Sequence, residues 1–129
     1  MVETALTKDL IEAGKVLVRE LDKTQLEPDA AFWFYFPDIQ AWKLVIAEIK
    51  VGPRGPKEVY SQIQRILRKL PKDVAVLSLD DIALARPDAA IVALLRKAVR
   101  TGPGISGIRF KRNVIDGMLI EDAYIYRVR

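Results

Sequence analysis

The side chains that could do chemistry in this chain are restricted by two missing residue types. None of the 129 residues is histidine or cysteine. A Ser-His-Asp or Cys-His arrangement, a histidine general base and a zinc site of histidine and cysteine ligands are therefore excluded. Any catalysis would have to use carboxylates, lysines, tyrosines, hydroxyls or groups supplied by a partner.

One short combination of carboxylates and a lysine stands out. The tripeptide at 48–50 ends a predicted apolar strand, and a Pro-Asp dipeptide precedes it twice, at 28–29 and at 37–38. Residues two apart on a strand point to the same face of a sheet. The side chains of Glu48 and Lys50 would therefore lie on one face.

This pattern resembles the signature of the PD-(D/E)xK nucleases over a short part of the chain. The resemblance implies that Asp29 and Glu48 bind a divalent cation, usually Mg²⁺, and that Lys50 positions or activates the attacking water. Tyr60 and Gln62 on the following predicted helix extend the likeness, because some members of that superfamily carry a glutamine there.

The second Pro-Asp dipeptide does not fit such a site. Asp38 falls in the predicted hairpin loop, roughly 26 Å along an extended strand from Glu48, so these two carboxylates cannot share a cation. The alternative to a metal site is a charged pair between Glu48 and Lys50, at the point where a core strand reaches water.

The predicted register of the hairpin also bears on the metal site. We expect Phe36 to pair with Trp42 across the loop. In that register Glu48 lies opposite Ala30, so Asp29 points to the other face. A β-bulge would be needed to bring the two carboxylates together.

Basic residues offer a further function, because clustered cations bind phosphate. The chain has 21 Lys and Arg against 17 Asp and Glu, a net charge of +4. Smaller clusters occur at 96–100 and 109–112. The candidate nucleic-acid contacts are Arg65, Arg68, Lys69 and Lys72. The alternative is local, because cations are also expected near helix C-termini, where they complement the helix dipole.

Composition predicts one soluble domain. Hydrophobic residues make up 50% of the chain and charged residues 29%, and 129 residues is a common size for a single domain, so we expect one domain over 1–129. No apolar run reaches the roughly 18 residues of a membrane-spanning helix, and residues 1–10 lack the apolar stretch of a signal peptide. We expect a cytoplasmic protein without membrane contact.

Hydrophobic periodicity predicts three helices and two hairpins. Apolar residues spaced three or four apart predict helices over 4–22, 57–70 and 88–100. Runs of β-branched and aromatic residues predict strands over 30–36, 42–50, 74–79, 105–115 and 118–128, with a further extended piece at 82–85. The order α-β-β-α-β-α-β-β predicts an α/β fold of the α+β type, with a single mixed sheet covered by helices.

The last hairpin has the clearest local signal. The dipeptide at 116–117 is Asp-Gly, which favours a two-residue turn. With that turn Lys111 lies opposite Asp122 and Arg112 opposite Glu121, and both pairs attract. A shift of one residue would lose both matches.

Aromatic residues outside the predicted core face suggest a surface for a partner. Trp33 and Tyr35 share one face of their strand, and Tyr124 and Tyr126 share one face of the last strand. These side chains would either lie under a helix or form an exposed patch. With the usual catalytic residue types missing, we expect a non-catalytic interaction or accessory module without a cofactor, acting as a homo-oligomer or with a protein partner. The alternative is a Mg²⁺-dependent nuclease or a nucleic-acid-binding domain.

Three further stretches carry a second resemblance. Residues 44–47, 55–58 and 120–127 are similar to small uncharacterised bacterial α/β proteins, and the likeness extends over most of the chain. It implies a shared fold and brings no activity, ligand or functional residue. In those proteins the position of Glu48 need not be acidic.

Overall fold

A five-stranded mixed sheet forms the centre of the protein. The computed structural model describes residues 5–47, 55–71, 77–86 and 89–129. In chain order the elements are α1 (Lys8–Asp22), β1 (Ala30–Phe36), β2 (Ala41–Ala47), α2 (Pro56–Lys69), the 3-10 turn η1 (Leu79–Asp81), β3 (Ile82–Ala85), α3 (Ala90–Ala98), β4 (Ile108–Ile115) and β5 (Met118–Val128). The predicted α/β class and the order α-β-β-α-β-α-β-β are confirmed.

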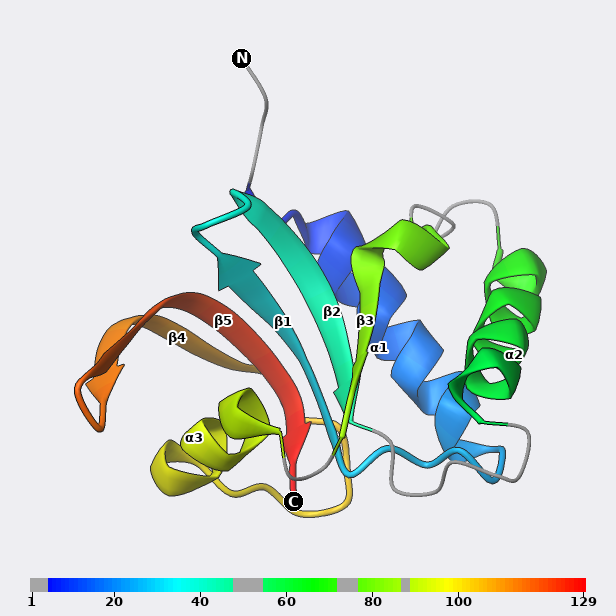
Figure 1. Ribbon diagram of the computed structural model, residues 1–129. Coiled ribbons are helices and arrows are strands. Elements are labelled where there is room, and N and C mark those ends of the chain that lie inside the picture. The colour runs from blue at the N-terminus through cyan, green and yellow to red at the C-terminus, as the bar shows by residue number, and fades with distance from the viewer. Residues whose placement is uncertain (1–4, 48–54, 72–76, 87–88) are drawn as a thin grey trace.

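The strands lie in the order β3-β2-β1-β5-β4, and only β2 and β3 run parallel. A parallel pair needs a crossover, and α2 provides it. Helices α1 and α2 cover one face of the sheet and α3 covers the other (Figure 1). The central strand β1 is therefore buried on both faces.

Side chains of β1 alternate between the two cores that this arrangement creates. Ala31 and Trp33 join the core under α1 and α2, whereas Phe32 and Phe34 join the core under α3. Nearly every residue of β1 is apolar, as a strand covered on both faces requires.

The predicted register of the β1–β2 hairpin is wrong by one residue. Phe36 pairs with Ala41 and not with Trp42, and Ala30 pairs with Ala47. A four-residue loop makes this register possible, because Gln40 adopts a positive φ of 50°. Since both faces of β1 are apolar, burial gives no signal that would distinguish the two registers.

The predicted strand over 74–79 is wrong in its described part, 77–79, whereas the predicted extended piece at 82–85 is confirmed as β3. Leu79 begins the 3-10 turn η1, and the strand that pairs with β2 is Ile82–Ala85, in which Ile82 lies opposite Leu44. The carboxylate of Asp81 closes the start of the turn, because its Oδ2 accepts the Ser78 backbone N–H at 3.0 Å. Residues 72–76 lie outside the described ranges.

Helix α2 matches the predicted 57–70 to within one residue at each end, whereas α1 begins later and α3 ends earlier than predicted. Helix α1 begins at Lys8 because the hydroxyl of Thr7 accepts a hydrogen bond from the Leu10 N–H at 3.2 Å. In α3 the buried residues are Val92 and Leu95, while Ala98 is exposed. Among the described residues, no helix is long and apolar enough to cross a membrane.

The terminal hairpin confirms its prediction. Ile115 pairs with Met118 across a two-residue turn, and Lys111 lies opposite Asp122. Asp116 and Gly117 have φ of 51° and 77°, which is the backbone conformation that an Asp-Gly turn favours.

Candidate functional site

Asp29, the first residue of the predicted metal site, lies just before β1. Its backbone N–H donates to the Ala47 carbonyl at 3.1 Å, and its Oδ2 accepts from Arg96 Nη2 at 3.2 Å. Its carbonyl accepts the Arg129 N–H at 3.0 Å. Asp29 is thus tied to β2, α3 and the end of β5. No group of three Asp or Glu side chains suited to a metal ion occurs within the described ranges.

The other two residues of that prediction, Glu48 and Lys50, lie outside the described residues. The observed register nevertheless affects the argument that Asp29 and Glu48 point to opposite faces of the sheet. It assumed that Phe36 pairs with Trp42, and the observed pairing of Phe36 with Ala41 removes that assumption. The claim that Asp29 and Glu48 point to opposite faces therefore loses its basis.

The predicted nucleic-acid contacts on α2 are not brought to Asp29. Arg65, Arg68 and Lys69 are exposed on the C-terminal half of the helix, and Lys72 lies outside the described residues. Because α2 connects the parallel strands β2 and β3, its C-terminal half lies toward the start of β3, at the opposite end of the sheet from Asp29 (Figure 1).

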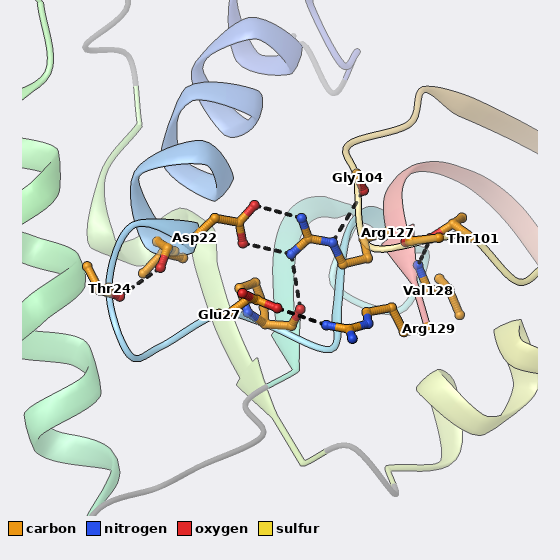
Figure 2. A network of polar contacts seen from close by, with 11 residues as sticks. Asp22, Thr24, Glu27, Thr101, Gly104, Arg127, Val128 and Arg129 are labelled. Carbon is orange, nitrogen blue, oxygen red and sulfur yellow. Dashed lines mark hydrogen bonds and ion pairs between the residues drawn. The ribbon is translucent and has the colours of Figure 1, made fainter.

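A buried arginine occupies the Asp29 end of the sheet. Arg127 is 1% exposed, and its guanidinium donates to both carboxylate oxygens of Asp22 at 2.8 and 2.7 Å. It also donates to the carbonyls of Pro28 and Gly104 at 3.1 and 3.3 Å. Figure 2 shows these bonds converging from α1 and two loops. The charge is paired and hydrogen-bonded, as a buried charge must be.

The same end is closed by smaller contacts. Thr101 Oγ1 accepts the Val128 N–H at 3.0 Å, and the exposed side chain of Arg129 donates to Glu27 Oε1 at 2.9 Å (Figure 2). Sequence reasoning missed this network. A single arginine between apolar residues at the end of a core strand, as at Arg127, was the available signal.

Two of the four aromatic residues considered for a partner surface are buried under α1. Trp33 Nε1 donates to Tyr126 Oη at 2.9 Å, and Tyr126 Oη donates to the Ile11 carbonyl at 2.5 Å. Burial raises the pKa of the Tyr126 hydroxyl well above its ordinary value of 10. Gly14 of α1 leaves the room for this pair, because a Cβ there would lie 2.4 Å from Tyr126 Oη.

The other two aromatic residues, Tyr35 and Tyr124, are half-buried. Tyr35 borders a cavity of about 590 Å³ near the start of α1. Across the sheet, Tyr35 pairs with Trp42, and Lys111 pairs with Asp122. All four side chains line the cavity, with Leu6 forming part of its wall. The cavity therefore lies on the face that α1 covers, beyond the helix N-terminus.

Charged side chains fill one side of this cavity. Arg109 Nε and Nη2 donate to Asp122 at 2.7 and 2.8 Å, and Arg109 Cζ lies 5.8 Å from the centroid of the Trp42 ring. The hydrogen bond to Asp122 raises the pKa of the Arg109 guanidinium. By contrast, the side chains of Lys111, Arg112 and Glu121 make no hydrogen bond or ion pair with any described residue.

An irregularity in β4 explains how so many charges gather there. Consecutive side chains of a regular strand point to opposite faces. Arg112 has a φ of 51°, and the pairing with β5 skips from Lys111 opposite Asp122 to Asn113 opposite Ile120. As a result Lys111 and Arg112 line the same cavity. The expected pairing of Arg112 with Glu121 is not formed.

The tip of the same hairpin carries exposed apolar side chains. The exposed fractions of Val114, Met118 and Leu119 are 66%, 60% and 56%. The β4–β5 hairpin extends past the rest of the sheet, and Lys97 of α3 forms an ion pair with Asp116 in its turn (Figure 1). We call these three residues the hairpin tip.

Comparisons of the chain with family models, curated proteins and solved structures found no match.

Proposed function

We propose that this chain is a non-catalytic interaction module that associates with a second copy of itself through the hairpin tip. The observation that carries the proposal is the exposure of three large hydrophobic side chains on one hairpin. Val114 and Leu119 lie opposite each other and share a face, and Met118, opposite Ile115, lies on the other face. Among the described residues four large hydrophobic side chains are exposed, and three of them form the tip, with Ile39 as the fourth. Exposed apolar side chains concentrated on one element are typical of interaction sites, whereas scattered exposed apolar residues are ordinary.

The strand edges support association less well than the tip. The edge strand β4 carries Arg109, Lys111 and Arg112, and like charges oppose pairing of two such edges. The other edge strand, β3, has only four residues, and its Leu84 N–H already donates to the Tyr60 hydroxyl at 3.3 Å. Association by strand addition is therefore disfavoured at both edges.

A second copy fits the tip because the contact can be symmetric. Val114, Met118 and Leu119 are uncharged, so the tip can pack against its own copy without placing like charges together. Three side chains bury much less than the roughly 800 Å² per partner of a stable complex. We therefore expect weak association that depends on protein concentration.

Sedimentation equilibrium tests this proposal over a range from micromolar to millimolar protein. The weight-average mass of the wild type should rise above the 14.6 kDa of one chain as concentration increases. The double variant Met118→Ser, Leu119→Ser should stay monomeric. Ile39→Ser, which removes the exposed hydrophobic side chain outside the tip, should associate like the wild type. A wild type that is monomeric at millimolar concentration, or a double variant that associates like the wild type, would contradict the proposal.

A second candidate is a metal-dependent nuclease with Asp29 and Glu48 as cation ligands and Lys50 as the group that positions water. The observation in its favour is the hydrogen bond from the Asp29 N–H to Ala47, the residue that precedes Glu48 in the sequence. Arg96 binds one carboxylate oxygen of Asp29, which leaves the other oxygen for a cation.

Cleavage assays on DNA and RNA with Mg²⁺ or Mn²⁺ test this candidate. Glu48→Ala, Lys50→Ala and Asp29→Asn should each abolish cleavage. Asp38→Asn provides a matched control, because Asp38 belongs to the Pro-Asp dipeptide in the hairpin loop. Cleavage that survives Glu48→Ala, or no cleavage by the wild type on any substrate, would reject the nuclease.

A further inference from the structure

We propose that the cavity between β4 and the start of α1 binds a nucleoside monophosphate, either free or as one unit of a single strand. The inference goes beyond the self-association proposed above and uses none of the hairpin-tip residues. A volume of about 590 Å³ lies within the usual range of roughly 300 to 1,000 Å³ for ligand pockets.

Two unpaired cations provide the phosphate-binding part of the cavity. Lys111 and Arg112 line it, and neither side chain has a partner among the described residues. With Arg109, Glu121 and Asp122 the lining carries three positive and two negative charges, so it favours an anionic ligand. Arginine and lysine are the side chains that most often bind phosphate oxygens.

The backbone at Arg112 strengthens this argument. A residue other than glycine with a φ of 51° adopts a conformation that costs about 1–3 kcal/mol. Such strain persists where the surrounding structure enforces it, and it is concentrated at ligand sites. Here its effect is to bring the side chain of Arg112 to the cavity beside Lys111. A regular strand would have turned one of the two away.

Aromatic side chains provide the part of the cavity that fits a base. Tyr35 and Trp42 lie with ring centroids 5.6 Å apart at an interplanar angle of 61°, and both line the cavity. Arg109 lies over Trp42 and is fixed by two hydrogen bonds to Asp122. Bases stack on aromatic rings and on guanidinium groups, so a base can stack on the Arg109 guanidinium or on the Tyr35 ring.

The remaining carboxylate fits the sugar. Glu121 lines the cavity without a partner among the described residues, and a carboxylate accepts hydrogen bonds from hydroxyl groups. A ribose between base and phosphate would place its hydroxyls within the cavity. The cavity thus has aromatic side chains for a base, a carboxylate for sugar hydroxyls and cations for a phosphate.

The cavity is also separate from the candidate metal site. Asp29 precedes β1, whereas Tyr35 lies near its end, and six residues of extended chain span about 20 Å. Because the two sites are this far apart, binding at the cavity can be measured with EDTA present, independently of a cation at Asp29. Failure of this inference and failure of the nuclease candidate are then distinguishable.

Isothermal titration calorimetry in EDTA provides the test. The ligands are AMP, GMP, CMP and UMP, with adenosine, inorganic phosphate and free tryptophan as comparison ligands. At least one mononucleotide should bind with one site per chain, and adenosine and phosphate should bind at least about tenfold more weakly, because each lacks one of the two contacts. DNA and RNA tetramers distinguish the sources: tighter binding of a tetramer indicates a strand, and equal binding indicates a free nucleotide.

Matched charge variants complete the experiment. The double variant Lys111→Gln, Arg112→Gln should weaken mononucleotide binding at least about tenfold. Lys15→Gln with Arg19→Gln removes two exposed cations of α1 and should change binding less than about twofold. The proposal is overturned if no mononucleotide binds at millimolar concentration, if tryptophan binds more tightly than every nucleotide, or if the two double variants behave alike.

Discussion

At two places in the sheet, the side chains of two consecutive strand residues lie on the same face. On a regular strand, consecutive side chains point to opposite faces. Tyr126 and Arg127 both bond to α1, through the Ile11 carbonyl and through Asp22. Lys111 and Arg112 both line the cavity. In each case the backbone is irregular: β5 shifts register against β1 at the first pair, and Arg112 has a positive φ and no partner in a β4–β5 pairing that keeps its register.

The two irregularities differ in what surrounds the side chains. Tyr126 and Arg127 are each 1% exposed, and their polar atoms are hydrogen-bonded. Lys111 and Arg112 are exposed and have no side-chain partner among the described residues. Buried and fully bonded groups fix a fold, whereas exposed and unpaired charges beside a cavity remain available to a ligand. A local backbone irregularity therefore supports structure at one end of the sheet and, in our proposal, binding at the other.

Removing the buried arginine should have the largest effect. Arg127→Met leaves Asp22 and the carbonyls of Pro28 and Gly104 without their donor, so we expect a loss of about 3 kcal/mol in the free energy of unfolding, at the lower end for buried pairs because Asp22 is partly exposed. Urea denaturation measures the change. Arg112→Met makes the same chemical change at the other end and should alter stability by less than about 0.5 kcal/mol. Equal losses would show that the two ends do not differ.

Filling the space beneath α1 should have the next largest effect on the free energy of unfolding. Gly14→Ala places a Cβ 2.4 Å from Tyr126 Oη and 2.8 Å from Trp33 Nε1. Overpacking should exceed the gain in helix propensity, for a net loss of about 2 kcal/mol in thermal or urea unfolding. Gly102→Ala is the control, because no atom lies within 4 Å of a Cβ at that position. A stabilised Gly14→Ala variant would contradict the close packing of α1 on this pair.

Tyr126 should also make stability depend on alkaline pH. Burial raises its pKa above the ordinary value of 10, so the unfolded chain loses this proton first. The stabilisation is complete below pH 10 and decreases as pH rises above it, by up to about 1.4 kcal/mol per pH unit. The difference in unfolding free energy between the wild type and Tyr126→Phe, measured from pH 8 to 11, isolates this proton. A difference that does not vary with pH would exclude a buried neutral Tyr126.

The smallest expected change is a gain in stability. Arg112→Gly relieves the positive φ of 51° and should raise the free energy of unfolding by about 1 kcal/mol, while weakening mononucleotide binding. Thermal unfolding and calorimetry measure the two effects on one variant. Lower stability would mean that the Arg112 side chain supports the fold.

Local sequence signals predicted the terminal hairpin correctly. The Asp-Gly turn and the register that places Lys111 opposite Asp122 are confirmed, although Asp122 forms its ion pair with Arg109 and not with Lys111. The predicted β1–β2 register was wrong for two reasons. Apolar residues on both faces of β1 leave no alternation of apolar and polar residues from which the register could be predicted. The positive φ in the loop is at Gln40, and a glutamine does not predict a positive φ as a glycine would.

The cavity could not be predicted for a different reason. It needs β1 between β2 and β5, a long-range arrangement, and it needs the broken pairing at Arg112. The sequence showed consecutive cations at 111–112 facing consecutive carboxylates at 121–122, and regular pairing of all four was the natural expectation. The two cations opposite two carboxylates were the available signal for this site, but they did not distinguish a cavity from regular pairing.

Amide hydrogen exchange most directly tests whether the two ends of the sheet differ in role. The measurement compares the wild type at micromolar and millimolar concentration, without and with a mononucleotide. We expect added protection at 113–119 on raising concentration and at 109–112 and 121–122 on adding nucleotide, with no change at 22–30 or 126–128. Protection that increases around Asp29 and Arg127, and stays constant along the β4–β5 hairpin, would contradict the account.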